Sequence, residues 1–581
     1  MNNTGVIQTS KSADLTTFKI LVEGEELSKA YEVKSITVSK ETNRIPTAEF
    51  VLIDGDPSGR DFKLSNEELL IPGKKIEITA GYHSDEETIF KGIVIKHNLR
   101  IRANTSQLIV QCKDEAVKMT VGRKSTYFYE STDSDIFEEL IGKYSLSKEV
   151  ESTNHSHAEL VQYNASDWDF MVSRAQANGK LCFVDDGTIT IAKPNVSQSE
   201  IETVTFGGSL LDFDAEIDAR HQVQKVAAYG WNHADQELLE IEGKDPKISL
   251  NGNLSVNDLQ EVIGLENLEL RHGGAVTDTE LQDWADAKWL FQQLAKVRGR
   301  MKFQGIPSVK PNTIIKLEGV GDRFNGNVYI TGVQHVISEG NWVTNAQFGL
   351  STEWFSETFE ISASPASGLL PAIQGLQVGI VSQLEEDPDG EDRILVQIPI
   401  INNTEEGIWC RVASPDAGEN RGIFFRPEIG DEVIVGFINQ DPNDAIVLGM
   451  LHSSAKPAPI TAADDNHEKG IITRSEMKVL FDDDKKIITI ETPAGKIISL
   501  DEDAGAITIE DDNSNVITIN SDGISMESAG DISIKASGDV IIEGTNVGIT
   551  ANAEFKAEGS AGAEVSTSAI AVLKGSLVQI N

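Results

Sequence analysis

Apolar and polar residues alternate with a period of two along most of the chain, which is typical of β-strands with one buried face. In the first section, from about residue 15 to 125, the alternating runs are separated by Gly, Asn, Asp or Pro. These runs are FKILVEGEEL, YEVKSITVSK, AEFVLID, KKIEITAGY, IFKGIVIKHNLRI and QLIVQC. Their short spacing predicts a small β-barrel over residues 1–125.

Three later segments change to the apolar spacing of amphipathic helices. They lie near 133–145, at 167–178 and after residue 277. The predicted N-caps are Asp133 or Ser134, Ser166, and Thr277, the last in a capping box with Glu280. Strands resume at 300–350, so the section 126–370 is predicted to combine helices with further strands.

A third section, residues 371–455, follows a linker with the sequence SASPASGLLPA at 362–372. Its short apolar runs are separated by turns rich in Gly, Pro and Asp. The runs are GIV, RILVQIP, IWCRVA, DEVIVGF and AIVLGML. Short strands with such turns predict an OB-fold barrel.

The C-terminal section repeats one short strand and one tight turn, each strand carrying a pair of apolar residues. The pairs are Ile488/Ile490, Ile498/Leu500, Ile507/Ile509, Ile517/Ile519, Ile524/Met526, Ile532/Ile534, Val540/Ile542 and Val547/Ile549. Two apolar residues per strand cannot form a core within one unit, so burial must come from stacking. Since each period supplies one strand, we predict that residues 487–581 form an intertwined triple-stranded β-helix in a homotrimer. A linker or neck at 456–486 would precede this needle.

The alternative for this section is a flexible tail rich in Gly, Ser and Asp. Strict alternation of Ile and Val is not the composition of a disordered segment, so the alternative is disfavoured. Residues 465–581 hold 21 acidic and 9 basic residues. We therefore expect the outward positions of the needle to be acidic and solvated.

The whole chain is strongly acidic, with 92 Asp and Glu against 50 Lys and Arg and a formal charge of −42. This balance argues against binding to nucleic acid or to anionic lipid, because both depend on clustered basic residues. No secretory signal and no apolar run of about 20 residues occurs. We expect synthesis in the cytoplasm and no stable membrane association.

Candidate chemistry is sparse. The three cysteines lie far apart and are expected to be small core residues: Cys112, Cys182 and Cys410. His155 and His157 are the only close histidine pair, but KEVESTNHSHAEL suggests a solvated loop or strand edge without a third ligand. Acidic runs at 482–484, 501–503 and 510–512 recur at the turns of the repeat, which favours solvated charge over calcium binding. We predict no catalytic residue, no cofactor and no metal site.

Several long strings resemble the spike proteins of contractile injection systems. This family includes the valine–glycine repeat (VgrG) spike of type VI secretion, the hub and spike proteins of tailed phages, and the spikes of extracellular tail-like particles. The resembling strings are VQYNASDWDFMVSRAQANGKLCFVDDG (161–187), residues 378–418, RPEIGDEVIVGFINQDPNDAIVLGML (426–451) and the C-terminal repeat. The resemblance implies a trimeric hub with two small barrels and helical insertions, a tail tube and baseplate components as partners, and effector cargo.

The chain departs from some of these relatives. Only residues 452–471 separate barrel and needle, so a lysozyme domain like that of one phage relative does not fit, and no toxin domain follows the needle. No histidine follows His467, so an iron-binding apex is not expected. A separate conical tip, like the Pro-Ala-Ala-Arg (PAAR) protein, is implied instead. The predicted seat for this tip is formed by Leu577, Val578, Gln579, Ile580 and Asn581.

The resulting expectation is a structural, non-enzymatic spike that caps the tube of a contractile apparatus, punctures a target envelope and delivers effectors. Such a spike would be ejected into the target cell or the extracellular space. Two alternatives remain open at this point. One is a baseplate peptidoglycan hydrolase with an unrecognised active site in 125–300. The other is a receptor-binding tail fibre, which would need an adhesin domain after the repeat.

Overall fold

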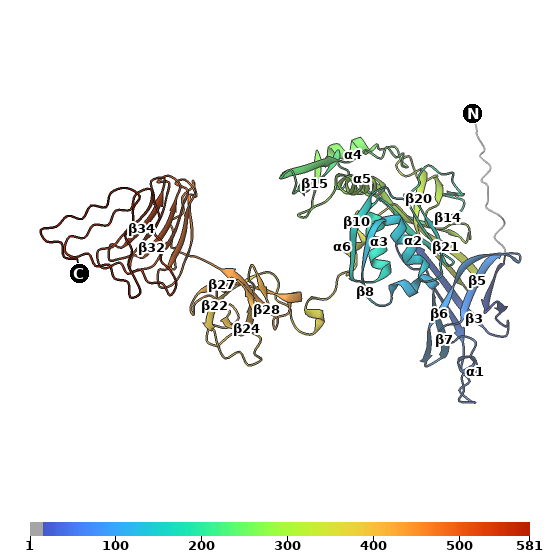
Figure 1. The fold of residues 1–581 in the computed structure, drawn as a ribbon. Coiled ribbons are helices and arrows are strands. Elements are labelled where there is room, and N and C mark those ends of the chain that lie inside the picture. The colour runs from blue at the N-terminus through green and yellow to red at the C-terminus, as the bar shows by residue number, and fades with distance from the viewer. Residues whose placement is uncertain (1–14, 581) are drawn as a thin grey trace. The chain divides into compact units, whose positions relative to one another are not determined.

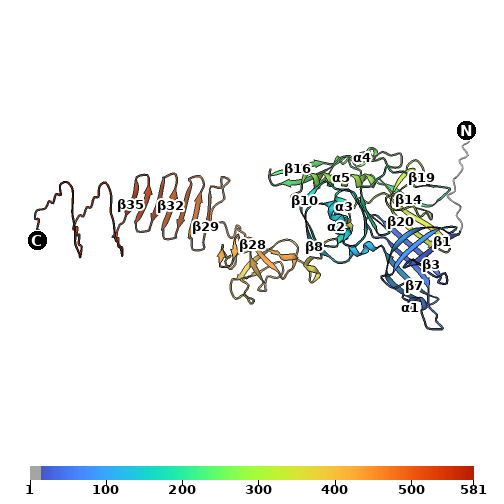
Figure 2. The same ribbon diagram turned by 45° about the vertical axis from the view of Figure 1, so that its right-hand side comes forward.

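The computed structural model of the chain describes residues 15–580. It divides into two compact units, Met1–Ile373 with Asn439–Pro442, and Gln374–Ile438 with Asn443–Asn581. Strands dominate both units, and helices are confined to the first (Figures 1 and 2). The mainly β architecture with helical insertions that the sequence predicts is confirmed.

The first unit is organised around one 13-stranded sheet. The predicted runs of the N-terminal section form seven of its strands: β1 (Thr16–Val22), β2 (Glu25–Glu26), β3 (Val33–Glu41), β4 (Thr47–Ile53), β5 (Lys75–Tyr82), β6 (Asp85–Arg102) and β7 (Thr105–Lys113). The others come from later in the chain: β13 (Glu202–Thr205), β14 (Leu210–Ile217), β18 (Val297–Gln304), β19 (Ile314–Glu318), β20 (Gly326–Ser338) and β21 (Asn341–Phe348).

The spacing of the apolar runs predicts a separate small barrel over residues 1–125, and the resemblance implies a second one. Instead, the two strand-rich sections share this sheet through the pairing of β3 with β20. Ile36 lies opposite Ile337 in that ladder. Ile337 and Trp342 belong to the same buried core as Phe50 of β4. The sections are therefore continuous here because β20 offers apolar residues to the core of the N-terminal strands.

Helices and small sheets surround this framework. The longer helices are α2 (Asp133–Gly142), α3 (Asp167–Ala177), α4 (Val256–Ile263) and α5 (Asp278–Leu294), and the short ones are α1 (Lys63–Asn66), α6 (Phe355–Thr358), η1 (Glu115–Thr120) and η2 (Pro365–Gly368). The small sheets pair β8 (Lys124–Thr132) with β10 (Ser156–Ala165), β12 (Thr188–Ala192) with β9 (Ser147–Val150) and β11 (Leu181–Asp185), and β15 (Lys225–Asn232) with β16 (Glu237–Glu242) and β17 (Asn267–Arg271).

The predicted N-caps of α3 and α5 are confirmed, whereas that of α2 is wrong. Ser166 accepts a hydrogen bond from the backbone of Asp169, and Thr277 and Glu280 form a capping box. The cap of α2 is Thr132, neither Asp133 nor Ser134. The hydroxyl of Thr132 accepts the backbone N–H of Asp135, which leaves the Asp133 carboxylate free to bind other side chains.

The second unit begins with a closed five-stranded barrel, which confirms the predicted OB fold. Its strands are β22 (Gln377–Gln383), β23 (Ile394–Gln397), β24 (Ile408–Val412), β27 (Glu432–Phe437) and β28 (Ala445–Met450). The hairpin β25 (Ala417–Gly418) and β26 (Arg421–Gly422) and the turn η3 (Ile438–Gln440) lie between them in sequence. Gly407 has φ +109°, and a Cβ there would lie 2.1 Å from the Val396 carbonyl oxygen, so only glycine fits this barrel corner.

The barrel is followed by a seven-stranded antiparallel meander, which we call the ladder. Its strands are β29 (Glu468–Ile472), β30 (Lys478–Asp482), β31 (Ile487–Glu491), β32 (Ile497–Asp501), β33 (Ala506–Glu510), β34 (Val516–Asn520) and β35 (Gly523–Glu527). Each strand pairs with its neighbours in sequence (Figure 2). The ladder thus begins at Glu468, within the segment that the sequence suggests as a linker, because Val479 and Phe481 continue the apolar pattern of β31.

Candidate functional site

One face of the ladder is almost entirely apolar. The other, which we call the polar face, mixes hydroxyl and charged side chains with Leu480, Ile487, Ile497 and Val516. Cross-strand partners share a face, and the registers match Ile490 with Ile498 and Ile498 with Ile509. The apolar face is formed by Ile471, Val479, Phe481, Ile488, Ile490, Ile498, Leu500, Ile507, Ile509, Ile517, Ile519, Ile524 and Met526. Thr489, Ser499 and Thr508 lie on the opposite face.

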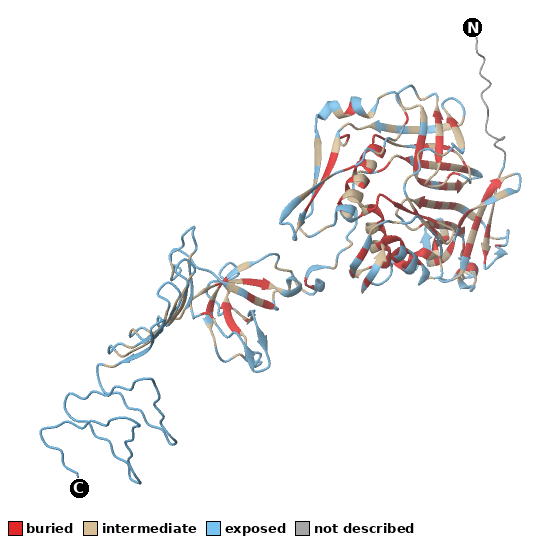
Figure 3. Ribbon diagram, turned by 45° about the horizontal axis from the view of Figure 1, so that its top comes forward, coloured by how far each residue is buried: buried red, intermediate tan, exposed pale blue. Residues whose placement is uncertain are grey.

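In the ladder the apolar face is more exposed than the polar face, whereas a folded single chain is expected to bury its apolar side chains. Ile490 is 44% exposed and Ile509 is 45% exposed, whereas Thr489 and Ser499 on the polar face are only partly exposed. Figure 3 shows buried segments in the first unit and in the barrel, but none in the ladder. A continuous exposed apolar strip of this kind marks an interaction surface.

The predicted tip seat lies at the end of the described chain. Leu577 is 81% exposed, Val578 51% and Ile580 84%, and Gln579 is also exposed. Asn581 lies outside the described residues. Beyond β35, residues 528–580 form no strand in the structure, although the apolar pairs of the repeat continue through Ile549.

The acidic runs of the repeat lie at its turns. The Asp511 carboxylate accepts hydrogen bonds from the side-chain amide of Asn515 and from the backbone N–H groups of Asn515 and Asn513, and these bonds lower its pKa to about 2. Asp482 accepts the backbone N–H of Lys485 in the turn between β30 and β31. These carboxylates therefore act as turn-stabilising acceptors.

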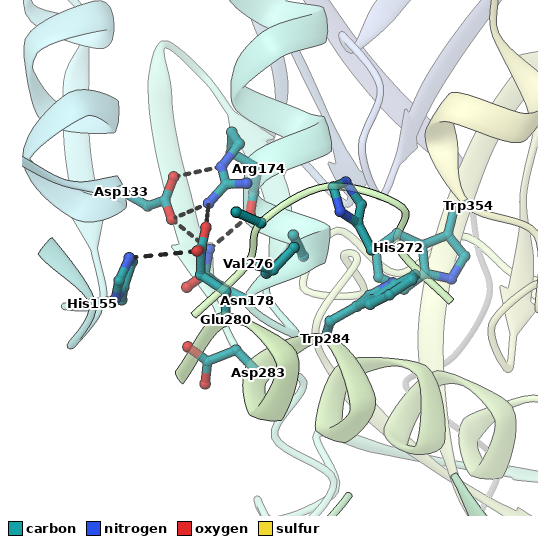
Figure 4. Close-up of a pocket in the computed structure, with 12 residues that line it drawn as sticks. Asp133, His155, Arg174, Asn178, His272, Val276, Glu280, Asp283, Trp284 and Trp354 are labelled. Atoms are coloured by element: carbon teal, nitrogen blue, oxygen red, sulfur yellow. Dashed lines mark hydrogen bonds and ion pairs between the residues drawn. The ribbon is translucent and has the colours of Figure 1, made fainter. Parts of the chain in front are cut away.

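A cavity of about 300 Å³ lies in the first unit, between the helices and the loop before β10 (Figure 4). It is lined by Asp133, His155, Arg174, Ala177, Asn178, His272, Ala275, Val276, Glu280, Asp283, Trp284 and Trp354. The lining combines several titratable side chains with two tryptophans, which is the composition of a binding site.

A buried ion pair forms one wall of this cavity. Arg174 of α3 donates to both carboxylate oxygens of Asp133 at 2.8 Å, and Asn178 donates to the same carboxylate at 2.9 Å. Burial alone would raise the pKa of Asp133, but hydrogen bonds from His157 and Arg174 outweigh it and hold this pKa well below its usual range. At Asp283 burial prevails, and the pKa is raised by desolvation and by the neighbouring carboxylate of Asp286.

The histidine pair meets Glu280 beside this ion pair. Nε2 of His155 lies 3.7 Å from Oε2 of Glu280, and Nδ1 of His157 lies 3.7 Å from Oε1 of the same carboxylate. Nε2 of His157 lies 3.1 Å from Oδ2 of Asp133. The expectation of a solvated segment is wrong for His157, which is 6% exposed, because the α2–α3 pair and α5 close over it.

Glu280 is the residue of this cluster that sequence reasoning missed as a possible ligand. The sequence marks it as the third residue of a capping box, and that interaction is present. Nothing in the spacing between residues 157 and 280 shows that α5 lies against β10. The only available signal was the histidine pair itself.

The cysteines take no part in the cavity. Cys112, Cys182 and Cys410 are buried and free, as predicted. Burial raises the pKa of both Cys112 and Cys410 to about 12, so these thiols stay protonated and unreactive. Among residues 15–580, none of the helices combines the length and the apolarity needed to cross a bilayer.

Two family models match the chain. The Alg8 N-terminal domain matches residues 12–339, which is more than half of the chain. The type VI secretion system/phage-baseplate injector OB domain matches residues 377–452, the segment that holds all five strands of the closed barrel.

Several curated relatives are named as spike proteins. The type VI secretion system spike protein VgrG1a of Pseudomonas aeruginosa is 24% identical over 258 residues, which cover 39% of this chain and 39% of that protein. The spike protein VgrG3 of Vibrio cholerae is 35% identical over 75 residues, or 13% of this chain and 7% of that protein. The chain therefore aligns with well under two thirds of these relatives' own lengths.

Solved structures include the E. coli c3393 protein, described as a component of the type VI secretion system. It is 12% identical, with 74% of this chain and 100% of that chain covered at a TM-score of 0.38. TM-scores this low carry no argument, so the assignment rests on the family models and the named relatives. The chain belongs to the Alg8 N-terminal domain family, and it resembles the VgrG spike proteins of contractile injection systems.

Proposed function

We propose that three copies of this chain assemble into a spike whose needle is built from three ladders with their apolar faces turned inward. The exposed apolar face of the ladder carries this proposal. In the trimer, residues 1–370 form the hub, 371–455 the OB domain and 487–581 the triple-stranded β-helix needle, which the ladder strands β29 and β30 extend back to Glu468. The polar faces and acidic turns would then face solvent.

The energetics favour such an assembly. Full burial of an isoleucine contributes about 1.5–3 kcal/mol. Covering the exposed part of each side chain on the apolar face of the ladder therefore contributes about 1 kcal/mol. The side chains of this apolar face, from Ile471 to Met526, contribute to the burial in every copy. Their sum over three chains exceeds the cost of about 4–15 kcal/mol for each association step.

The assembled spike would work mechanically. The hub would dock on the tail tube and baseplate components, and the needle would puncture the target envelope. Leu577, Val578, Gln579, Ile580 and Asn581 would seat a PAAR-like tip protein. The exposure of the first four of these residues supports this role.

Effector cargo is the remaining part of the proposal. We propose that the present chain is made in the cytoplasm, assembled into a contractile particle, and ejected with its cargo into a target cell or the extracellular space.

Sedimentation of the full-length chain tests the assembly. Analytical ultracentrifugation at micromolar concentration should give a single species with three times the 63.2 kDa mass of the chain. A stable monomer across the concentration range would overturn the proposal.

We propose that the chain has no enzymatic activity of its own, as expected for a structural spike. The peptidoglycan hydrolase alternative is not favoured, because the named relatives matched here are spike proteins. Zymography on purified cell walls checks this point. No clearing is expected, and clearing abolished by Glu280→Gln would refute it.

A further inference from the structure

The cavity in the first unit holds a set of donors that the spike role does not use. His155, His157 and Glu280 each offer one ligand atom, and these atoms lie within 4.8 Å of one another. The rings of the two histidines meet edge to face, with centroids 4.6 Å apart. The three residues come from the loop before β10, from β10 itself and from the first turn of α5.

The separations are close to those of a tetrahedral zinc site. Zinc bonds to His nitrogen and carboxylate oxygen are about 2.0–2.2 Å long, which places neighbouring ligand atoms about 3.4 Å apart. The Glu280 oxygens lie 3.7 Å from Nε2 of His155 and 3.7 Å from Nδ1 of His157. The ligand atoms must move slightly closer together to bind zinc. His155 precedes the first paired residue of β10, Ser156, so it can make this movement without disturbing the strand.

A second carboxylate orients the buried histidine. Oδ2 of Asp133 lies 3.1 Å from Nε2 of His157, which can donate its N–H there and direct Nδ1 toward Glu280. A carboxylate that binds the far nitrogen of a ligating histidine fixes its tautomer and raises its basicity. Asp133 is itself held by Arg174 and Asn178, so this support is rigid.

The local charge also suits a cation. Nη2 of Arg174 lies 3.9 Å from Oε1 of Glu280 and 3.2 Å from Nε2 of His157, and the guanidinium donates its two 2.8 Å hydrogen bonds to Asp133. Asp133 neutralises that positive charge, which leaves the carboxylates of Glu280 and Asp283 at the cavity wall. Three protein ligands leave a fourth position, and the cavity of about 300 Å³ provides room there for water or a ligand.

We propose that His155, His157 and Glu280 bind one divalent transition-metal ion, with zinc as the best match to two imidazoles and a carboxylate. The ion ties the N-terminal turn of α5 to the edge of the two-stranded β8–β10 sheet. It therefore cross-links two segments within each copy of the N-terminal unit and does not depend on trimer formation.

Titration of the chelator-treated full-length protein tests the site. Calorimetry with zinc chloride should show one saturable zinc per chain, and cobalt(II) should give the intense visible absorption of tetrahedral coordination. Zinc should also raise the midpoint of thermal unfolding. Glu280→Gln is the key variant, because glutamine keeps the capping box of α5 but removes the anionic ligand.

His155→Ala is the second variant, since His155 is only partly buried and its loss should leave the fold intact. Both variants should bind zinc at least tenfold more weakly and lose the cobalt spectrum. His233→Ala, which changes an exposed histidine outside the cluster, should bind as the unchanged chain does. The proposal is wrong if neither zinc nor cobalt binds saturably, or if the first two variants bind as tightly as the His233→Ala control.

Discussion

The OB barrel and the ladder are both built from short, mostly antiparallel strands with alternating apolar residues, yet they place those residues in opposite environments. Val433 and Val435 of the barrel are 0% exposed, whereas Ile490 and Ile509 of the ladder are 44% and 45% exposed. The same local pattern therefore yields a complete core in one region and an uncovered face in the other.

Strand connectivity explains the difference. In the barrel, β22 pairs with β23 on one side and with β27 on the other, so the sheet closes on itself and encloses one face. In the ladder, every strand pairs only with its sequence neighbours, so the sheet grows in one direction and encloses nothing. In the proposed trimer, the other two chains would cover this apolar face.

The largest expected effect comes from a charge on the apolar face of the ladder. Ile498→Asp would place a carboxylate in the needle interior of all three chains, where an unpaired charge costs several kcal/mol per copy. We expect loss of the trimer in analytical ultracentrifugation. Ser499→Asp is the matched control, because it adds the same charge to the opposite face of the same strand. Equal effects of the two changes would contradict the inward orientation of the apolar face of the ladder.

A core substitution in the barrel should act differently. Ile394→Ala removes a side chain that is 0% exposed, and such a change costs about 2–4 kcal/mol through lost burial and the remaining cavity. Hydrogen exchange of β23 and β24 should accelerate, while the oligomeric state should stay that of the unchanged chain. Dissociation of the assembly by this variant would show that the barrel is not a self-sufficient core.

The sequence was sufficient for those features that depend on local pattern. Alternation placed the strands of the N-terminal section and all five barrel strands, and capping chemistry located α3 and α5 through Ser166 and Thr277. The apolar face of the ladder could also be predicted from the sequence, because its apolar pairs recur at regular intervals. Each of these signals spans only a few residues.

Features that depend on contacts distant in sequence were not readable. The pairing of β3 with β20 joins two sections that the sequence could only treat separately. The approach of Glu280 to the histidine pair depends on how α5 packs, which no periodicity encodes. The cap of α2 was misplaced because Asp133, a good capping residue, is used instead to bind Arg174.

The core of the N-terminal unit is buried like that of the barrel, and it contains a histidine that should make its stability depend on pH. His335 is 3% exposed, and burial together with Lys40 and Lys310 lowers its pKa to about 3. The unfolded chain takes up a proton near pH 6.5 while the native imidazole stays neutral, so stability falls as pH drops from about 6.5 to about 3. At pH 4.5 this loss amounts to about 2–3 kcal/mol.

His335→Gln removes the titration and can keep a hydrogen bond to Thr344, whose Oγ1 lies 3.0 Å from Nδ1 of His335. We expect the exchange of β20 and β21, corrected for intrinsic rates, to depend less on pH in this variant. An unchanged pH dependence between 6.5 and 4.5 would assign the acid sensitivity to other groups.

The smallest effect is expected on the polar face of the ladder, and it tests which face lies inside the needle. Lys478 and Glu491 are cross-strand partners on that face, with Nζ and Oε2 3.2 Å apart and side chains about one-third exposed. If the polar face is solvated in the trimer, Lys478→Gln should cost about 0.2–1 kcal/mol and leave the assembly intact. If that face were packed against partner chains, breaking the pair would leave the Glu491 carboxylate buried without a partner. The stability of the assembly would then fall by about 3–5 kcal/mol. Thermal unfolding and sedimentation of this one variant therefore separate the two orientations.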